Sequence, residues 1–164
     1  MGKARTVGIG MDYSATSKVA LRWAAENLVD GGDCMVLIHV QSPKADNPQK
    51  KLWEDTGSPL IPWEEFRETN ISKQYGLTLD PEVLNILDTV ANTKGVKVMA
   101  KIYWGDPREK LCDAVEDLKL DSIVVGSRGL GALKRMLVGS VSKHVVSNAA
   151  CPVTVVKGTY SGKC

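Results

Sequence analysis

Short apolar runs alternate with amphipathic stretches along nearly the whole chain, and this alternation constrains the fold more than any other feature. The β-type runs cover residues 5–11, 33–40, 96–104, 121–125 and 152–157. Apolar residues at helical spacing cover residues 15–30, 80–93, 106–118 and 141–150. The run at 33–40 is apolar almost without a break, which is typical of a strand buried on both faces of a parallel sheet. The sequence therefore predicts an α/β fold, in which a doubly wound, five-stranded parallel sheet lies between two layers of helices.

Capping residues indicate where three of the predicted helices begin. Ser14 precedes the first helical stretch and has a side chain typical of an N-cap. Asp80 is followed by a proline, which suits the first helical position. Asp106 begins the sequence Asp-Pro-Arg-Glu, a close variant of the capping box. We therefore expect helices to begin directly after these three residues, and we expect Gly95 to end the second of them.

Residues 41–78 are the least regular part of the chain. They contain four of the seven prolines and two of the four tryptophans, Trp53 and Trp63. A segment this long without regular structure is uncommon inside a compact domain. Two interpretations stay open: a partly ordered excursion, with a helical turn at residues 63–66, that covers a site or contacts a partner, and a mobile insertion.

Length and charge narrow the class of protein. A length of 164 residues suits one domain. The net charge of +2 is close to neutral, so we do not expect a nucleic-acid partner. No apolar stretch of the sequence approaches the ~18 residues that a membrane span requires. The N-terminus leads straight into a strand and lacks the apolar core of a signal peptide. We expect a cytoplasmic protein with no membrane partner, formed by a single domain over residues 1–158 with an insertion at about 42–78 and a flexible tail over 159–164.

The four cysteines show neither a C-x-x-C pair nor zinc spacing. In a reducing compartment free thiols are the expected state. Cys34, Cys112 and Cys151 lie in or beside apolar runs and are interpreted as core residues. Cys164 is terminal, so an intermolecular disulfide under oxidation stays open for it.

Residues 122–142 combine a strand, a glycine-rich loop and the start of a helix. Gly126, Gly129 and Gly131 follow the apolar run, and Gly139-Ser140 opens the last helical stretch, where Ser140 is the expected cap. Such an order suits an anion, because a helix N-terminus exposes unpaired N–H groups and carries partial positive charge. The loop is not a Walker A motif, and Gly8-Ile-Gly10 has Tyr13 where a Rossmann fingerprint needs its third glycine. A simple strand–helix turn with a surface loop is the alternative.

Several motifs together resemble one family. Gly126 and Gly129, followed after nine residues by Gly139-Ser140, form the pattern G-2x-G-9x-G-[ST] of the ATP-binding universal stress proteins. The end of the first strand at Met11-Asp12-Tyr13, the closing of the second at His39-Val40, and the final Cys151-Pro-Val-Thr-Val-Val also resemble this family. The insertion is similar to that of plant members. The resemblance covers nearly all of the chain except the tail, and it implies an adenine nucleotide alpha hydrolase-like sheet with strand order 3-2-1-4-5.

This resemblance implies a site for ATP or AMP. Asp12 would hold the ribose or a metal-bound water, with Mg²⁺ or Mn²⁺ as the ion, and Val40 would contact adenine through its backbone. The two glycine clusters would fold together around the ribose and phosphates. The residues that the resemblance assigns to the nucleotide are Met11, Asp12, Tyr13, Val40, Gly126, Ser127, Arg128, Gly129, Gly139, Ser140, Val141 and Ser142.

The family resemblance also implies a homodimer through the last strand, and an apolar edge strand from Pro152 to Val156 supports this from the sequence. Larger oligomers and client proteins stay open. We favour a nucleotide-binding stress-response or signalling protein that acts through nucleotide-dependent conformation and dimerisation. The alternatives are a holdase-type chaperone with redox-dependent oligomerisation and a slow metal-dependent ATPase. No catalytic residue is assigned, since Asp12 is a lone carboxylate without a positioned partner.

Overall fold

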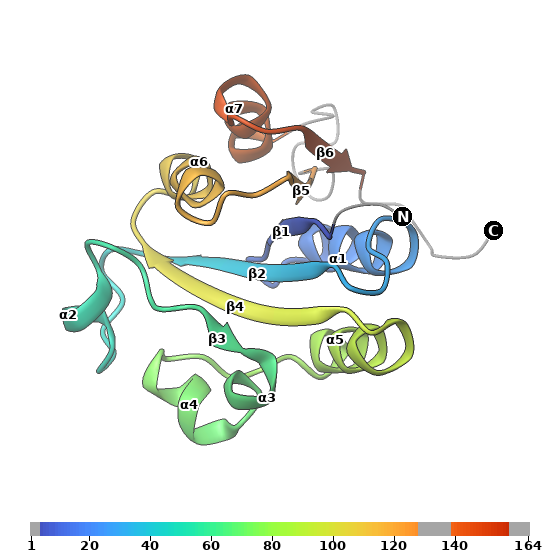
Figure 1. Cartoon of the computed structure of the whole chain (residues 1–164). Coiled ribbons are helices and arrows are strands. Elements are labelled where there is room, and N and C mark those ends of the chain that lie inside the picture. The colour runs from blue at the N-terminus through green and yellow to red at the C-terminus, as the bar shows by residue number, and fades with distance from the viewer. Residues whose placement is uncertain (1–3, 128–138, 158–164) are drawn as a thin grey trace.

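The computed structural model describes residues 4–127 and 139–157 and shows a sheet with the strand order β3-β4-β2-β1-β5-β6 (Figure 1). Its strands are β1 (Thr6–Gly10), β2 (Cys34–Gln41), β3 (Ile61–Pro62), β4 (Lys97–Trp104), β5 (Ser122–Gly126) and β6 (Val153–Val156). All neighbouring strands are parallel except β3, which runs antiparallel to β4. The predicted order of the five parallel strands is confirmed, and β3 is an additional edge strand that the sequence analysis did not predict.

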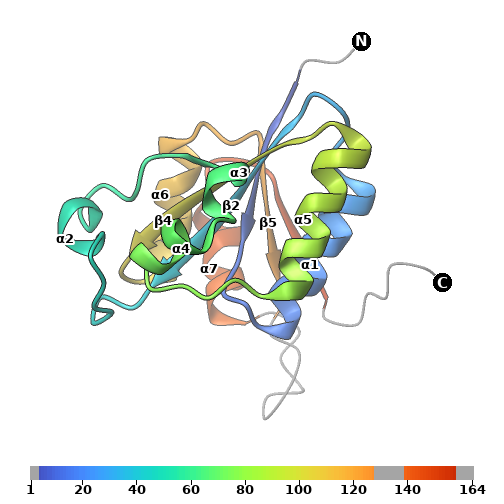
Figure 2. The ribbon, with the colours of Figure 1, turned by 90° about the horizontal axis from the view of Figure 1, so that it is seen from below.

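Helices cover both faces of this sheet, as predicted. Helices α1 (Ala15–Asn27) and α5 (Pro81–Lys94) lie on one face, and α6 (Pro107–Asp117) and α7 (Ser140–Asn148) lie on the other (Figure 1, Figure 2). Strand β4 shows how the two cores are separated. Its Ala100 and Ile102 belong to the apolar cluster under α1 and α5, whereas Met99 and Tyr103 belong to the cluster under α6 and α7. Because side chains alternate along a strand, a strand buried on both faces is apolar throughout.

The predicted helix starts are confirmed at three helices. The hydroxyl of Ser14 accepts a hydrogen bond from the Ser17 N–H at the start of α1. Asp80 accepts from the N–H groups of the first turn of α5, and Asp106 does the same for α6. Gly95 ends α5 with φ of 69°, a left-handed conformation that glycine adopts without strain.

The insertion between β2 and α5 is an ordered excursion. It contains α2 (Lys50–Trp53), α3 (Trp63–Phe66) and α4 (Thr69–Gln74) in addition to β3, so the predicted turn at residues 63–66 is present as α3. Phe66 and Tyr75 are buried in the cluster under α1 and α5. The buried side chain of Gln41 holds the insertion to the sheet: its amide donates to the Tyr75 carbonyl, and its oxygen accepts from Trp104 Nε1 at 3.1 Å.

The remaining predictions concern membrane spans, cysteines and the tail. Within residues 4–127 and 139–157, none of the helices has the length and apolar character of a bilayer span. Cys34, Cys112 and Cys151 are half-buried free thiols, and burial raises the pKa of each. The tail at 159–164, including Cys164, lies outside the described residues.

Candidate functional site

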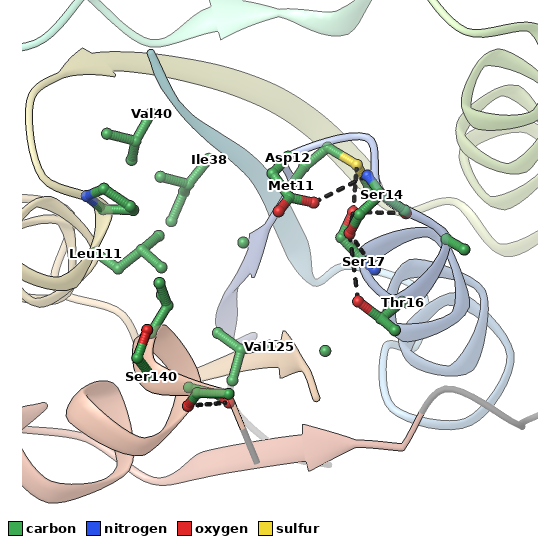
Figure 3. A pocket seen from close by; sticks show the side chains of 17 residues that line it. Met11, Asp12, Ser14, Thr16, Ser17, Ile38, Val40, Leu111, Val125 and Ser140 are labelled. Atoms are coloured by element: carbon green, nitrogen blue, oxygen red, sulfur yellow. Dashed lines mark hydrogen bonds between the residues drawn. The ribbon is translucent and has the colours of Figure 1, made fainter. Parts of the chain in front are cut away.

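A pocket of about 430 Å³ opens at the carboxyl ends of β1, β2 and β5 (Figure 3). The strands end at this pocket and the first turns of α1, α6 and α7 line it, so three helix N-termini meet there. This is the point where the chain order in the sheet reverses, which is where doubly wound folds bind ligands. Gly126 and the segment Gly139–Ser142 line the same space, so the structure brings the described glycines of the predicted site, Gly126 and Gly139, into one pocket.

Helix α7 differs from the other long helices at its N-terminus. Its N-cap is Gly139, with φ of −72° and ψ of 170°, and no side chain caps it. The predicted cap, Ser140, is wrong, because the extended backbone at Gly139 makes Ser140 the first helical residue. Within the described residues, the N–H groups of Ser140, Val141 and Ser142 have no acceptor, and these three residues line the pocket. Among residues 4–127 and 139–157, nothing therefore occupies the positive end of α7, and such a helix end suits an anion.

Hydroxyl groups at the start of α1 form the facing wall of the pocket. Ser14, Thr16 and Ser17 all line it, and Ser14 Oγ lies 3.3 Å from both Thr16 Oγ1 and Ser17 Oγ. Sequence reasoning treated Ser14 as a cap only and did not assign the other two to the site. The sequence did contain a signal for them, because hydroxyl residues cluster in the first turn of the helix that follows β1, directly beyond the carboxyl end of that strand.

Asp12 is the only charged side chain among the described residues that line the pocket. It is exposed, and its Oδ1 accepts from the Ser14 N–H at 2.9 Å. Partial burial would raise the pKa of this carboxyl, but hydrogen bonds from Ser14 and Ser17 outweigh it and hold the pKa below its ordinary value. Asp12 is therefore ionised at neutral pH.

The opposite end of the pocket is apolar, and two backbone groups there have no partner within the described residues. Strand β1 pairs with β2 as far as Ile38, whereas β4 pairs with β2 as far as Gln41. The Met11 N–H donates to the Ile38 carbonyl at 2.8 Å. Backbone groups alternate in direction along a strand, so the N–H and C=O of Val40 point to the same side of β2 as the Ile38 carbonyl does. They lie beyond the end of β1. They face a pocket whose apolar lining here is Ile38, Val40, Leu111 and Val125 (Figure 3).

Gly126 is required by packing against α1. A Cβ at this position would lie 2.5 Å from the Thr16 carbonyl oxygen and 3.1 Å from the Ser17 nitrogen. The family resemblance assigned this glycine to the nucleotide. The structure gives a further reason, because only a residue without a side chain lets β5 end against the first turn of α1.

Two of the predicted site residues lie beside the pocket rather than on its wall. Tyr13 has φ of 64°, and its ring packs edge-on against His39 with 5.3 Å between centroids. Its hydroxyl is buried and has no partner within the described residues, and burial together with Asp80 raises its pKa to about 12. Ser127 is buried, and its N–H donates to the Val156 carbonyl at 2.8 Å. Arg128 and Gly129 lie outside the described residues.

His39, near the end of β2, is bonded to the end of β1 beside the pocket. Its Nδ1 lies 2.8 Å from the Met11 carbonyl, so this nitrogen carries the proton. Burial lowers the pKa of His39, although the Met11 carbonyl and the charge of Asp12 oppose that effect. The neutral imidazole therefore holds the end of β1 in place.

The described residues contain no group of three or more His, Cys, Asp or Glu side chains that could hold a metal ion. Asp12 alone fits an ion whose other ligands come from a phosphate chain and water, which is how proteins commonly bind Mg²⁺. A metal in this pocket would therefore depend on the nucleotide.

Comparison with known proteins points to one family. Universal stress protein PHOS32 of Arabidopsis thaliana is 31% identical over 166 residues, a match that covers 95% of this chain and 66% of PHOS32. Universal stress protein A-like protein of the same plant is 34% identical over 148 residues, which cover 88% of this chain and 79% of that protein. A crystal structure of a universal stress protein family protein from Arabidopsis thaliana with AMP bound matches with a TM-score of 0.57 at 25% identity, over 93% and 91% of the two chains.

Residues 3–157 match the universal stress protein family, a range that contains every strand and helix of the described structure. The resemblance drawn from the glycine pattern and the strand ends is thereby confirmed. The chain belongs to the universal stress protein family.

Proposed function

We propose that this protein binds an adenine nucleotide, ATP or AMP, in the pocket at the carboxyl ends of the strands. The observation that carries the proposal is the first turn of α7, whose N–H groups face the pocket without a capping side chain. The structural neighbour crystallised with AMP supports the choice of nucleotide. We further propose that nucleotide binding changes the conformation and dimerisation of the protein in stress response or signalling.

The order of the strands suits the order of the parts of a nucleotide. Val40 lies near the end of β2, Asp12 follows β1, and Gly126 is the last residue of β5; these three strands lie side by side in the sheet. Adjacent strands are about 4.8 Å apart. A base at Val40, a ribose at Asp12 and phosphates between Gly126 and α7 therefore require no bend in the ligand.

Each part of the ligand would meet matching chemistry. The N–H and C=O of Val40 would bind an acceptor and a donor on the edge of adenine, while Leu111 and Ile38 would contact its faces. The ionised Asp12 would accept hydrogen bonds from ribose hydroxyls. The N–H groups of Ser140–Ser142 would bind phosphate oxygens, and contributions from Arg128 and Gly129 stay predictions.

This site can be tested at Gly139, the N-cap of α7, where no side chain of the described residues makes a capping hydrogen bond. The backbone at Gly139 is extended, which aspartate adopts readily at an N-cap. Gly139→Asp should stabilise the protein by about 1 kcal/mol, because the carboxylate caps the helix. It should also abolish AMP and ATP binding, because the carboxylate occupies the anion site. Calorimetric titration and thermal unfolding measure the two effects, with Gly139→Ala as the control for added volume. Unchanged affinity in a stabilised Gly139→Asp protein would refute the site.

We also propose that the homodimer forms through β6, from Pro152 to Val156. The other edge of the sheet is covered by β3, where Pro62 pairs with Met99. Strand β6 pairs with β5 alone among the described residues. The Ser127 N–H donates to the Val156 carbonyl, so the residue that follows Gly126 is bonded directly to the proposed dimer strand. A nucleotide that contacts Gly126 would in this way affect the edge.

The dimer is tested by a proline on the outward side of β6. The carbonyl groups of Pro152 and Val156 accept hydrogen bonds from Ile123 and Ser127, on the side of β5. Backbone groups alternate in direction along a strand, so the N–H of Val155 points the other way, to the open edge. Val155→Pro should separate the dimer without breaking the β5–β6 ladder, since edge strands tolerate proline there. Light scattering measures the mass. A dimer that persists in a folded Val155→Pro variant would contradict an interface through β6.

A further inference from the structure

We propose that Gln41 is a positioning residue for the base end of the pocket. Its side chain fixes the backbone of Val40 and thereby makes the recognition of adenine depend on the insertion between β2 and α5. The inference rests on the proposed nucleotide site. It adds a role for the insertion, which contributes no residue to the described lining of that pocket.

The end of β2 has a strand neighbour on one side only. Strand β1 pairs with β2 as far as Ile38, whereas β4 pairs with it as far as Gln41. On the side without a neighbour, Val40 lines the pocket (Figure 3). The N–H and C=O of Val40 point to that side, so among the described residues they make no ladder hydrogen bond. The position of Val40 therefore depends on the two residues that flank it.

Gln41, one of these two residues, is held by four hydrogen bonds. Its main-chain carbonyl accepts from the Gly105 N–H at 2.9 Å. Its side-chain oxygen accepts from Asn47 Nδ2 at 2.9 Å and Trp104 Nε1 at 3.1 Å, and its side-chain amide donates to the Tyr75 carbonyl. The residue is buried, and both lone pairs of the side-chain oxygen are used. A buried polar network that is satisfied in this way holds its members in one arrangement.

These hydrogen bonds join both ends of the insertion to the sheet. Asn47 lies near the start of the insertion and Tyr75 near its end, and both residues are buried. The Tyr75 ring is also stacked on the Trp104 ring of β4, with 6.2 Å between their centroids. Since Gln41 is bonded to both ends, the insertion is attached to the sheet at the residue next to Val40.

The network lies on the face of the sheet opposite to the Val40 side chain. Trp104 and Tyr75 belong to the apolar cluster under α1 and α5, whereas Val40 packs against the cluster under α6 and α7. Gln41 is not among the described residues that line the pocket. A base in the pocket would therefore contact the Val40 backbone and not the network. Loss of the network should weaken binding of the base and leave the phosphate site at the start of α7 unchanged.

The proposal is tested with AMP and with ribose 5-phosphate, which lacks the base, on the wild-type protein and Gln41→Met. Methionine has a similar length but cannot replace the hydrogen bonds of the amide. AMP should bind roughly tenfold more weakly to Gln41→Met, because the N–H and C=O of Val40 lose their alignment with the edge of adenine. Ribose 5-phosphate binding should change by less than about twofold. Calorimetric titration measures the affinity for AMP, and NMR titration measures that for the sugar phosphate.

Two tryptophans of the chain offer a matched pair of milder variants. Trp104→Phe removes the Nε1 donor to Gln41, and Trp63→Phe removes the Nε1 donor to Asp88, which lies at 2.8 Å; both tryptophans are buried. Trp104→Phe should weaken AMP binding roughly threefold, whereas Trp63→Phe should leave it unchanged. Neither variant should change the binding of ribose 5-phosphate. Trp104→Phe also serves as the test if Gln41→Met folds poorly.

Three results would overturn the inference and leave the nucleotide site intact. The first is an equal loss of affinity for AMP and ribose 5-phosphate in Gln41→Met. The second is an unchanged AMP affinity in a folded Gln41→Met protein. The third is equal weakening of AMP binding by Trp104→Phe and Trp63→Phe, which would assign the effect to the stability of the insertion as a whole. Absence of AMP binding to the wild type would overturn both the inference and the proposed function.

Discussion

The two ends of the sheet use aspartate in opposite ways. At the amino ends, Asp33 is buried and its carboxylate accepts three hydrogen bonds: from the Arg5 N–H at 3.0 Å, the Arg5 guanidinium at 2.9 Å and the Asp30 N–H at 2.9 Å. At the carboxyl ends, Asp12 is exposed in the pocket. Arg5 also donates to the Leu28 carbonyl at the end of α1, so the Asp33 cluster joins three chain segments.

The contrast shows where this fold places stability and where it leaves groups for a ligand. The amino ends are closed by ion pairs and hydrogen bonds within the chain. The carboxyl ends gather helix N-termini, hydroxyls and the Val40 backbone, and of these the N–H groups at the start of α7 have no acceptor within the described residues. Substitutions at the first end should therefore change folding and leave nucleotide affinity unchanged, and the reverse should hold at the second.

The largest effect is expected at the closed end. Asp33→Ala removes the carboxylate that accepts from the Arg5 guanidinium and from the N–H groups of Arg5 and Asp30, and it should lower the free energy of unfolding by about 3 kcal/mol. Urea denaturation measures the loss. Asp30→Ala is the matched control, since Asp30 is 87% exposed and lies 3.8 Å from Arg5. A change in AMP affinity in a folded Asp33→Ala protein would break the proposed separation of the two ends.

A substitution at Gly126 should change both the folding stability and the nucleotide affinity, because this residue lines the pocket and packs against α1. Gly126→Ala places a Cβ 2.5 Å from the Thr16 carbonyl, so the first turn of α1 must move. We expect a loss of about 2 kcal/mol in unfolding free energy and weaker AMP binding. Gly10→Ala is the control within the same pocket, where the nearest atom to the added Cβ is Val125 Cγ1 at 3.4 Å. Equal behaviour of the two variants would show that the contact with Thr16 does not matter.

Acid should weaken the closed end through Asp33. Burial would raise the pKa of Asp33, but N–H donors and the Arg5 guanidinium hold it below its ordinary value of 3.8. The unfolded chain therefore takes up this proton at higher pH than the folded protein does. The stability from Asp33 is complete above pH 3.8 and is lost as the pH falls through the folded pKa. Urea denaturation at pH 5 and below should show a smaller acid loss for Asp33→Asn than for the wild type, and parallel curves would contradict this account.

The smallest effect is expected at Tyr13, beside the pocket. Its hydroxyl is buried without a partner in the described part of the chain. Tyr13→Phe should raise the free energy of unfolding by at most about 1 kcal/mol, because an unsatisfied buried group is removed. AMP affinity should stay the same, as measured by calorimetry. Weaker binding would return Tyr13 to the nucleotide site that the family resemblance assigned to it.

Much of the fold could be predicted because its signals are local. The apolar run ending at Val40, the caps at Ser14, Asp80 and Asp106, and the stop at Gly95 act within a few residues of themselves. Strand β3 gave no such signal. It is two residues long and exists because the backbone of Ile61–Pro62 reaches the edge of β4, a contact between distant parts of the chain.

The pocket that the structure shows was indicated by the sequence in outline, whereas part of its lining was missed, for the same reason. The glycine pattern indicated a phosphate site, and the structure brings Gly126 and Gly139 into one pocket. Thr16 and Ser17 were missed because their role depends on where α1 lies beside β5. The cap of α7 was misassigned because serine is the commoner N-cap, and only the backbone angles at Gly139 show otherwise.

The sequence alone determined the layered α/β architecture and the family, because periodicity, capping residues and motif spacing are written in neighbouring positions. The tertiary structure decided how the motifs are arranged in space. It placed the start of α7, which no side chain of the described residues caps, at a pocket whose described lining has one carboxylate. It also placed β3 at one edge of the sheet. These properties arise from distances between residues far apart in the chain, which packing of the sheet against its helices establishes.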